Sequence, residues 1–118
     1  MRNKSDENWQ VGNQCLADGS LNAAANRLYY AVFQAVLDFA VAKQGYRNEG
    51  RGGVHAAMAR VVRSQGKASE HYHGVFRSLM VLRETADYER ETPDRAEIEA
   101  LVEDSNTIRT WYLGKAEN

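Results

Sequence analysis

The stretch from residue 21 to residue 44 constrains the fold more than any other part of this chain. Its apolar residues recur at spacings of three and four, the period of a helix, and do not alternate as strand residues do. One apolar stripe consists of Leu21, Ala24, Ala25, Leu28, Val32, Ala35, Val36 and Phe39. A second consists of Tyr30, Phe33, Leu37 and Val41. Only a narrow strip with Arg27, Gln34 and Asp38 stays polar, so we expect a helix covered on two sides, as at the centre of a bundle or in a subunit interface.

The rest of the chain follows the same helical period and contains a single proline, Pro93. We expect Ser20 to cap the central helix and Thr92 to cap a last helix that begins at Pro93. The further predicted helices cover about 6–17, 54–64, 69–91 and 93–113. The sequence therefore predicts one all-α domain over residues 1–118, an antiparallel up-down bundle of four to five helices.

The charge of the chain limits its partners. Fifteen Lys and Arg face sixteen Asp and Glu, for a net charge of -1, so any contact with nucleic acid has to be local. The one cysteine, Cys15, has no partner for an internal disulfide, which suits a reducing compartment. The apolar stretch 29–42 is too short to span a membrane, and no signal sequence follows the amino terminus. We expect a cytoplasmic protein that does not contact a membrane.

Metal binding and nucleophilic catalysis find little support in the residues. His71 and His73 stand beside Glu70, but residues two apart on a helix point to different faces, and no second cluster completes a tetrahedral site. Di-iron bundles need two Glu-x-x-His units and two further glutamates, and this chain has one such unit. Cys15 has apolar neighbours and no nearby basic residue to activate it. We therefore expect neither a metal nor a cofactor.

The glycine-rich segment 45–53, "GYRNEGRGG", separates two predicted helices. Glycine and polar clusters of this kind usually only connect elements. The alternative is a phosphate held by Arg47, Arg51 and the amino end of the helix that follows, whose free N–H groups favour anions.

The segment 82–90, "LRETADYER", places two pairs of side chains four residues apart on a helix, Arg83 with Asp87 and Glu84 with Tyr88. Arg83 falls at the margin of the core stripe, so we expect it to be partly sheltered. A sheltered arginine requires an acidic partner or a phosphate. One interpretation is an internal Arg83 to Asp87 pair that fixes helix packing, and the other is a functional role for Arg83.

Three segments together resemble a known family. They are "AANRLYYAVFQAVLDFAVAKQG" (24–45), "GGVHAAMARVV" (52–62) and "LRETADYE" (82–89), and they are similar to the HEPN superfamily, in particular to its small stand-alone bacterial and archaeal members with R-x-Y-Y-A-x-F and L-R-x-x-A-D-Y signatures. The resemblance implies a helical bundle that commonly dimerises, often with an Arg-x4-6-His motif at the dimer cleft that cleaves RNA without metal. Such proteins are frequently encoded beside a minimal nucleotidyltransferase, either as toxin and antitoxin or as substrate-binding partner and enzyme.

The motif arginine of that family corresponds to Arg83, but after four intervening residues stands Tyr88 where a histidine is expected. Metal-free RNA cleavage needs groups that exchange protons near neutral pH, which imidazole does and tyrosine does not. The resemblance therefore implies a non-catalytic homodimer that binds a nucleotide or RNA phosphate at Arg83 and partners a nucleotidyltransferase in a toxin-antitoxin-like pair. Asp87 would orient the arginine, and Tyr88 would stack or donate a hydrogen bond.

Two alternatives stay open. In the first, the chain is a metal-independent endoribonuclease in which Arg83 stabilises the transition state while Tyr88, Glu84 or a histidine from elsewhere moves protons. In the second, it is a purely structural bundle that binds another protein. The ligand-binding candidates of the non-catalytic module are Arg83, Asp87, Tyr88, Glu84, Arg27, Asp38, Arg47 and Arg51, and the catalytic candidates of the ribonuclease are Arg83 and Tyr88.

Overall fold

The computed structural model describes residues 3–47, 53–64, 69–88 and 92–117, and this part of the chain forms five α-helices and no strand. The helices are α1 (Lys4–Ala17), α2 (Leu21–Gln44), α3 (Val54–Arg63), α4 (Ser69–Tyr88) and α5 (Arg95–Glu117). The predicted all-α class is confirmed. Each predicted helix is present, and the central one has the predicted bounds.

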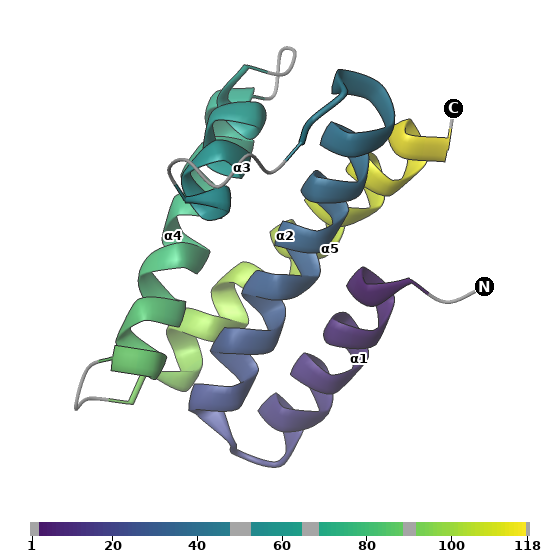
Figure 1. Cartoon of the computed structure of the whole chain (residues 1–118). Helices are drawn as coiled ribbons and strands as arrows, with labels where there is room; N and C mark the ends of the chain where they lie inside the picture. The colour runs from purple at the N-terminus through teal and green to yellow at the C-terminus, as the bar shows by residue number, and fades with distance from the viewer. Residues whose placement is uncertain (1–2, 48–52, 65–68, 89–91, 118) are drawn as a thin grey trace.

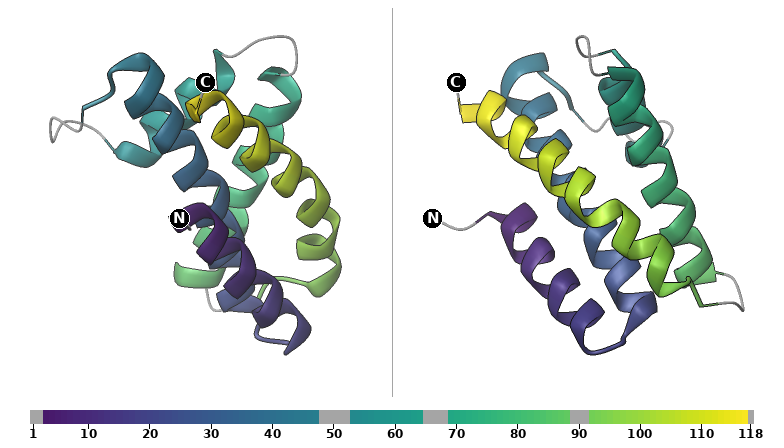
Figure 2. Two further views of the ribbon diagram at one scale, coloured as in Figure 1. Left: turned by 90° about the vertical axis from the view of Figure 1, so that its right-hand side faces the viewer. Right: turned by 180° about the vertical axis from the view of Figure 1, so that it is seen from behind.

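Helix α2 is the centre of the fold and contacts each of the other four helices. Helix α1 lies along one side of it, α3 and α4 lie on the other, and α5 crosses behind (Figures 1 and 2). The first predicted stripe is buried from Ala24 to Phe39. The prediction that α2 occupies the centre is therefore confirmed. The second stripe is less completely covered, since Val41 is 56% exposed.

Small residues bring α1 close to α2. A Cβ atom on Gly12 would lie 3.0 Å from Cδ2 of Leu28 and 3.2 Å from its backbone nitrogen. Any side chain larger than hydrogen at Gly12 would push the two helices apart. Helix α2 ends at Gln44 and is capped by Gly45, whose φ of 64° lies in the left-handed region that glycine adopts without strain.

The helix starts differ from the predicted caps. Ser20 stands at the N-cap position of α2, but its side chain makes no capping hydrogen bond. Helix α5 begins at Arg95, and the side chain of Asp94 accepts a hydrogen bond from the Ala96 N–H at 3.4 Å. The prediction of Thr92 as the cap was therefore wrong, because an aspartate two residues later supplies the acceptor.

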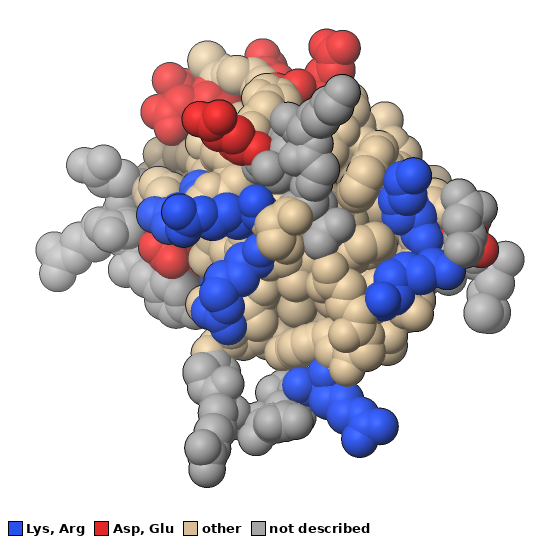
Figure 3. All heavy atoms as spheres, turned by 90° about the horizontal axis from the view of Figure 1, so that it is seen from above, with Lys and Arg blue, Asp and Glu red and all other residues tan. Residues whose placement is uncertain are grey.

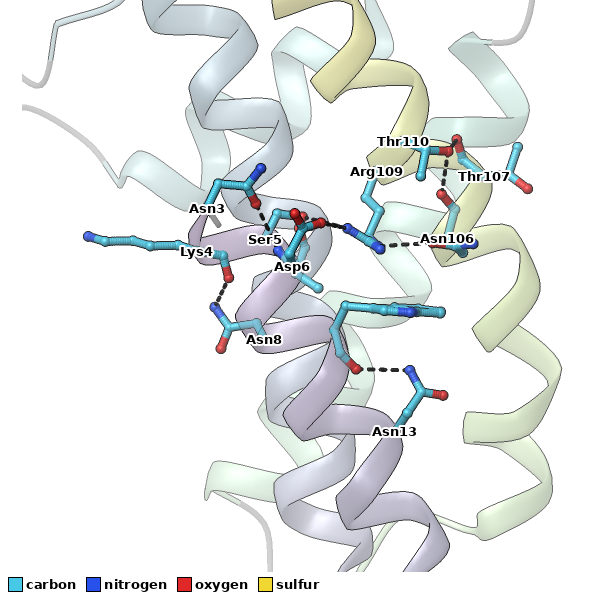
Figure 4. A network of polar contacts seen from close by, with 12 residues as sticks. Asn3, Lys4, Ser5, Asp6, Asn8, Asn13, Asn106, Thr107, Arg109 and Thr110 are labelled. Carbon is cyan, nitrogen blue, oxygen red and sulfur yellow. Dashed lines mark hydrogen bonds and ion pairs between the residues drawn. The ribbon is translucent and has the colours of Figure 1, made fainter. Parts of the chain in front are cut away.

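A buried arginine ties α1 to α5 (Figure 4). The Arg109 side chain is 9% exposed, and its Nη1 donates to Asp6 Oδ1 at 2.7 Å and to Ser5 Oγ at 3.4 Å. Its Nε donates to Asn106 Oδ1 at 3.0 Å, and its Cζ lies 4.9 Å from the centroid of the Trp9 ring. These contacts hold the start of α1 against the second half of α5.

Candidate functional site

The site begins with Arg83 on α4, whose side chain is 13% exposed. Its Cζ lies 5.5 Å from the ring centroid of Tyr29 and 5.4 Å from that of Tyr30, both on α2. Guanidinium groups at such distances are attracted to the negative faces of aromatic rings. The partly sheltered position expected for Arg83 is confirmed, and the two tyrosines account for the shelter.

Asp87 lies one turn further along α4 and makes the predicted pair. Its Oδ2 is 3.3 Å from Nε of Arg83. The side-chain amide of Asn26 on α2 donates to both carboxylate oxygens of Asp87, at 3.2 and 3.0 Å. This carboxylate therefore holds the arginine in one orientation and also fastens α4 to α2. The contact fits both interpretations of the pair, a packing contact and an arginine oriented for a ligand.

A histidine also lies in this neighbourhood, although the local motif lacks one. His55 stands in the first turn of α3, and its Nδ1 is 2.6 Å from the Tyr29 hydroxyl oxygen. The imidazole stacks on Phe33, with ring centroids 4.6 Å apart and planes inclined by 28°. Tyr29 thus contacts both the guanidinium of Arg83 and the imidazole of His55.

Partial burial lowers the pKa of His55, and the positive charge of Arg83 lowers this pKa further. Burial raises the pKa of Tyr29, against the opposing influence of Arg83, so the phenol keeps its proton at neutral pH. The neutral imidazole either accepts the Tyr29 proton at Nδ1 or donates Nδ1–H to the tyrosine oxygen. In the second tautomer the Nε2 lone pair is the basic one.

The lowered pKa of His55 predicts how stability depends on pH. The unfolded imidazole binds a proton near pH 6.5, whereas the folded one binds it only at lower pH, so the unfolded state holds more protons in between. The contribution of His55 to the free energy of unfolding is fully present above about pH 6.5 and is lost as pH falls through the folded pKa. We expect urea unfolding between about pH 7.5 and pH 5 to show a shallower acid decline in His55→Phe than in the wild type.

His71→Phe is the control for this pH series, because the His71 side chain is 63% exposed. Its removal should not make the acid decline shallower. Equal slopes in the wild type and His55→Phe would show that His55 is protonated alike in the folded and unfolded chains.

The remaining residues predicted on α4 are only partly placed. Glu84 is exposed, and its negative charge acts on Tyr29, where it raises the pKa of the phenol. Tyr88 is the last residue of α4, and its side chain lies outside the described part of the chain. Its predicted stacking role stays a prediction.

The candidates from α2 lie on the side of the helix that faces α1. Nη1 of Arg27 donates to Asn8 Oδ1 on α1 at 3.2 Å. Burial raises the pKa of Asp38, and Lys4 of α1 opposes this shift. The structure therefore does not bring Arg27 and Asp38 to Arg83, because their partners Asn8 and Lys4 belong to α1, whereas Arg83 belongs to α4.

The glycine-rich connector contributes little to the described site. Arg47 is exposed in the segment after α2, and Arg51 lies outside the described residues. Among residues 3–47, 53–64, 69–88 and 92–117, no group of three His, Cys, Asp or Glu side chains is arranged to hold a metal ion. His71 instead lies 3.7 Å from Asp104 of α5. No helix in the same ranges is long and apolar enough to cross a membrane.

Sequence reasoning found Arg83 and Asp87 but missed His55, Tyr29 and Asn26. Spacing on one helix reveals an i, i+4 pair, whereas these three residues reach the site from α2 and α3. The one local signal for His55 was its place on the core-facing side of α3, in register with Met58 and Val62, both of which are buried.

The chain was compared with protein-family models, curated proteins and solved structures. No match was found in any of the three comparisons, so the function has to be inferred from the geometry of the site itself.

Proposed function

We propose that this chain is an antiparallel helical-bundle module that binds a phosphate group of a nucleotide or RNA at Arg83. One observation carries the proposal. The partly sheltered guanidinium of Arg83 lies over the rings of two tyrosines, one of which is hydrogen-bonded to the imidazole of His55. We further propose a homodimer that partners a nucleotidyltransferase in a toxin-antitoxin-like pair. The dimer and the partner rest on the sequence resemblance to the HEPN superfamily alone.

The chemistry of Arg83 suits a phosphate. The planar guanidinium offers several donors in a fixed fork, which matches two phosphate oxygens at once. Asp87 holds the fork in place, so less conformational entropy is lost when an anion binds. Tyr30 is only partly buried, and it is therefore the ring of the pair on which a nucleobase can stack.

Calorimetric titration with adenosine monophosphate, and with adenosine as the probe without phosphate, tests this site. We expect Arg83→Ala to lower the affinity for the monophosphate about tenfold or more, since hydrogen bonds to charged groups contribute about 1.5–3 kcal/mol. Adenosine should bind weakly to both proteins. Arg95→Ala removes an exposed arginine from α5 and should bind the monophosphate as the wild type does.

The opposite result has a clear meaning. If Arg83→Ala unfolds at lower denaturant but keeps the wild-type affinity for the monophosphate, the arginine has only the packing role. The residues around Arg83 would then serve only to pack α4 on α2, through the hydrogen bonds of Asn26 with Asp87.

The position of His55 favours a second candidate function, metal-independent RNA cleavage. This reaction needs a base for the 2'-hydroxyl proton and a cation for the charge that develops on the phosphate. A neutral His55 with its proton on Nδ1 offers the base at Nε2, and Arg83 offers the cation. Glu84 is an exposed carboxylate next to Arg83 in the chain, and we assign it the second proton transfer.

Incubation of a mixed RNA pool with excess chelator separates the two functions. Fragments that disappear in both Arg83→Ala and His55→Gln would indicate a ribonuclease. Intact RNA in every lane, together with monophosphate binding, would leave the binding function alone.

A further inference from the structure

A second basic feature lies between α3 and α4, away from the residues discussed so far. It is a groove of about 230 Å³ with an apolar floor that includes Ala59 and Met80. Its polar lining consists of three arginines, Arg60, Arg63 and Arg77, and of His73. No carboxylate is among the described residues that line it. We refer to it as the α3–α4 groove.

The arginines of this groove are not neutralised within the described part of the chain. Arg60, Arg63 and Arg77 are exposed, and the described ion pairs involve other side chains, namely His71, Arg83, Arg95 and Arg109. Figure 3 looks onto the end of the molecule where α2 and α3 end and α4 begins. Lys and Arg side chains lie at several separate places around a largely uncharged surface, and Asp and Glu side chains gather along one edge of this face. In a chain with a net charge of -1, this concentration of positive charge favours a local anionic ligand.

The groove and the Arg83 site follow one seam of the fold. Helices α3 and α4 pack against each other, with the groove between them. Arg77 precedes Arg83 on α4 by about 9 Å along the helix axis at 1.5 Å per residue. Likewise, His55 stands in the first turn of α3, whereas Arg60 and Arg63 stand in its last turn. Six residues also turn the helix by about 240° at 3.6 residues per turn, so a ligand that contacts both sites has to follow the surface around α4.

We propose that the α3–α4 groove binds backbone phosphates of a single-stranded polynucleotide, a neighbouring phosphate of which lies at Arg83. The link to Arg83 rests on the proposed function, whereas the groove itself does not depend on it. Guanidinium forks fit phosphate oxygens, and exposed apolar surface between the cations suits the sugars and bases of a flexible strand. Single-stranded RNA and DNA share this backbone chemistry.

Fluorescence anisotropy with a labelled twelve-residue oligouridylate, the matching oligothymidylate and uridine monophosphate tests the proposal. The test variant is Arg60→Ser/Arg63→Ser/Arg77→Ser. We expect its affinity for the oligouridylate to fall at least about tenfold. The steepness of log K against log salt should fall by about 2, at roughly 0.7 for each phosphate that the protein no longer neutralises. Its affinity for the monophosphate should stay unchanged.

A matched variant separates the groove from net charge. Lys43→Ser/Arg95→Ser/Lys115→Ser removes the same charge from exposed positions elsewhere and should keep the wild-type affinity and salt slope. Equal reductions in affinity in the two triple variants would overturn the proposal. Unlabelled oligoglutamate of equal charge should displace the labelled strand less effectively than unlabelled oligouridylate does. Equal displacement by the two competitors would also overturn the proposal, because the groove would then show no preference for a polynucleotide.

The outcomes also distinguish this groove from the Arg83 site. An oligonucleotide that binds no tighter than the monophosphate, with Arg83→Ala impaired, rejects the groove and keeps the proposed function. Oligonucleotide binding that depends on the three groove arginines but not on Arg83 keeps the groove and rejects the Arg83 site. Equal binding of the RNA and DNA strands supports recognition through phosphates alone, and preference for RNA supports the groove with an added contact to the 2'-hydroxyl.

Discussion

Replacement of Arg109 by alanine is expected to lower the free energy of unfolding by about 3 kcal/mol, because it removes a buried cation whose hydrogen bonds join two distant helices. Asp6 would lose its donor at 2.7 Å, Asn106 would lose its donor as well, and the Trp9 ring would lose the guanidinium above it. The start of α1 would then be held mainly by its packing on α2. Urea unfolding monitored by circular dichroism at 222 nm measures the change in stability.

Arg95→Ala is the matched control on the same helix. Its ion pair with Glu99 spans 3.5 Å between half-exposed side chains, and such i, i+4 pairs contribute about 0.3–0.5 kcal/mol. A loss of stability of similar size in the two variants would mean that the Arg109 contacts add nothing beyond those of a surface arginine.

The burial of α2 shows how far the sequence alone determines this fold. An apolar stripe with helical period specifies which face is buried, and the predicted stripe from Ala24 to Phe39 is buried. Periodicity does not specify which residue at the margin is covered, since this depends on where the neighbouring helices lie. Tyr29 belonged to neither predicted stripe, yet its side chain is fully buried because α3 and α4 cover it through His55 and Phe76.

Arg109 illustrates a second limit. A prediction from hydrophobic periodicity places an arginine on the surface. Burial of the arginine becomes favourable, however, when another helix supplies several hydrogen-bond partners for it. Those partners, Ser5 and Asp6, are more than one hundred positions away in the chain. For the same reason, only one of the two pairs in the candidate site could be predicted from the sequence. The pair of Arg83 with Asp87 follows from spacing on one helix, whereas the contact of Tyr29 with His55 depends on how α2 and α3 pack.

Tyr29→Ala is expected to have a larger effect than Arg109→Ala, a loss of about 4 kcal/mol in the free energy of unfolding, as for other large buried aromatic side chains. The ring is fully buried and packs against Phe33, His55 and Phe76 at centroid distances of 5.9, 5.6 and 5.6 Å. Truncation would leave a cavity between α2, α3 and α4 and would remove one of the two rings beneath Arg83. Chemical denaturation at neutral pH measures the change in stability.

Tyr29→Phe separates the ring from its hydroxyl. It keeps the packing and removes only the hydrogen bond with His55, so we expect the free energy of unfolding to fall by about 1 kcal/mol. Equal losses of stability in the two variants would contradict the packing argument. Binding of adenosine monophosphate should survive in Tyr29→Phe, because the guanidinium of Arg83 still lies over both rings. Any RNA cleavage should fall in the same variant, since the hydroxyl oxygen that can accept the Nδ1 proton of His55, and so leave Nε2 as the basic nitrogen, is gone. One residue of the core thus supports the arginine through its ring and the histidine through its oxygen, and the two substitutions report on these supports separately.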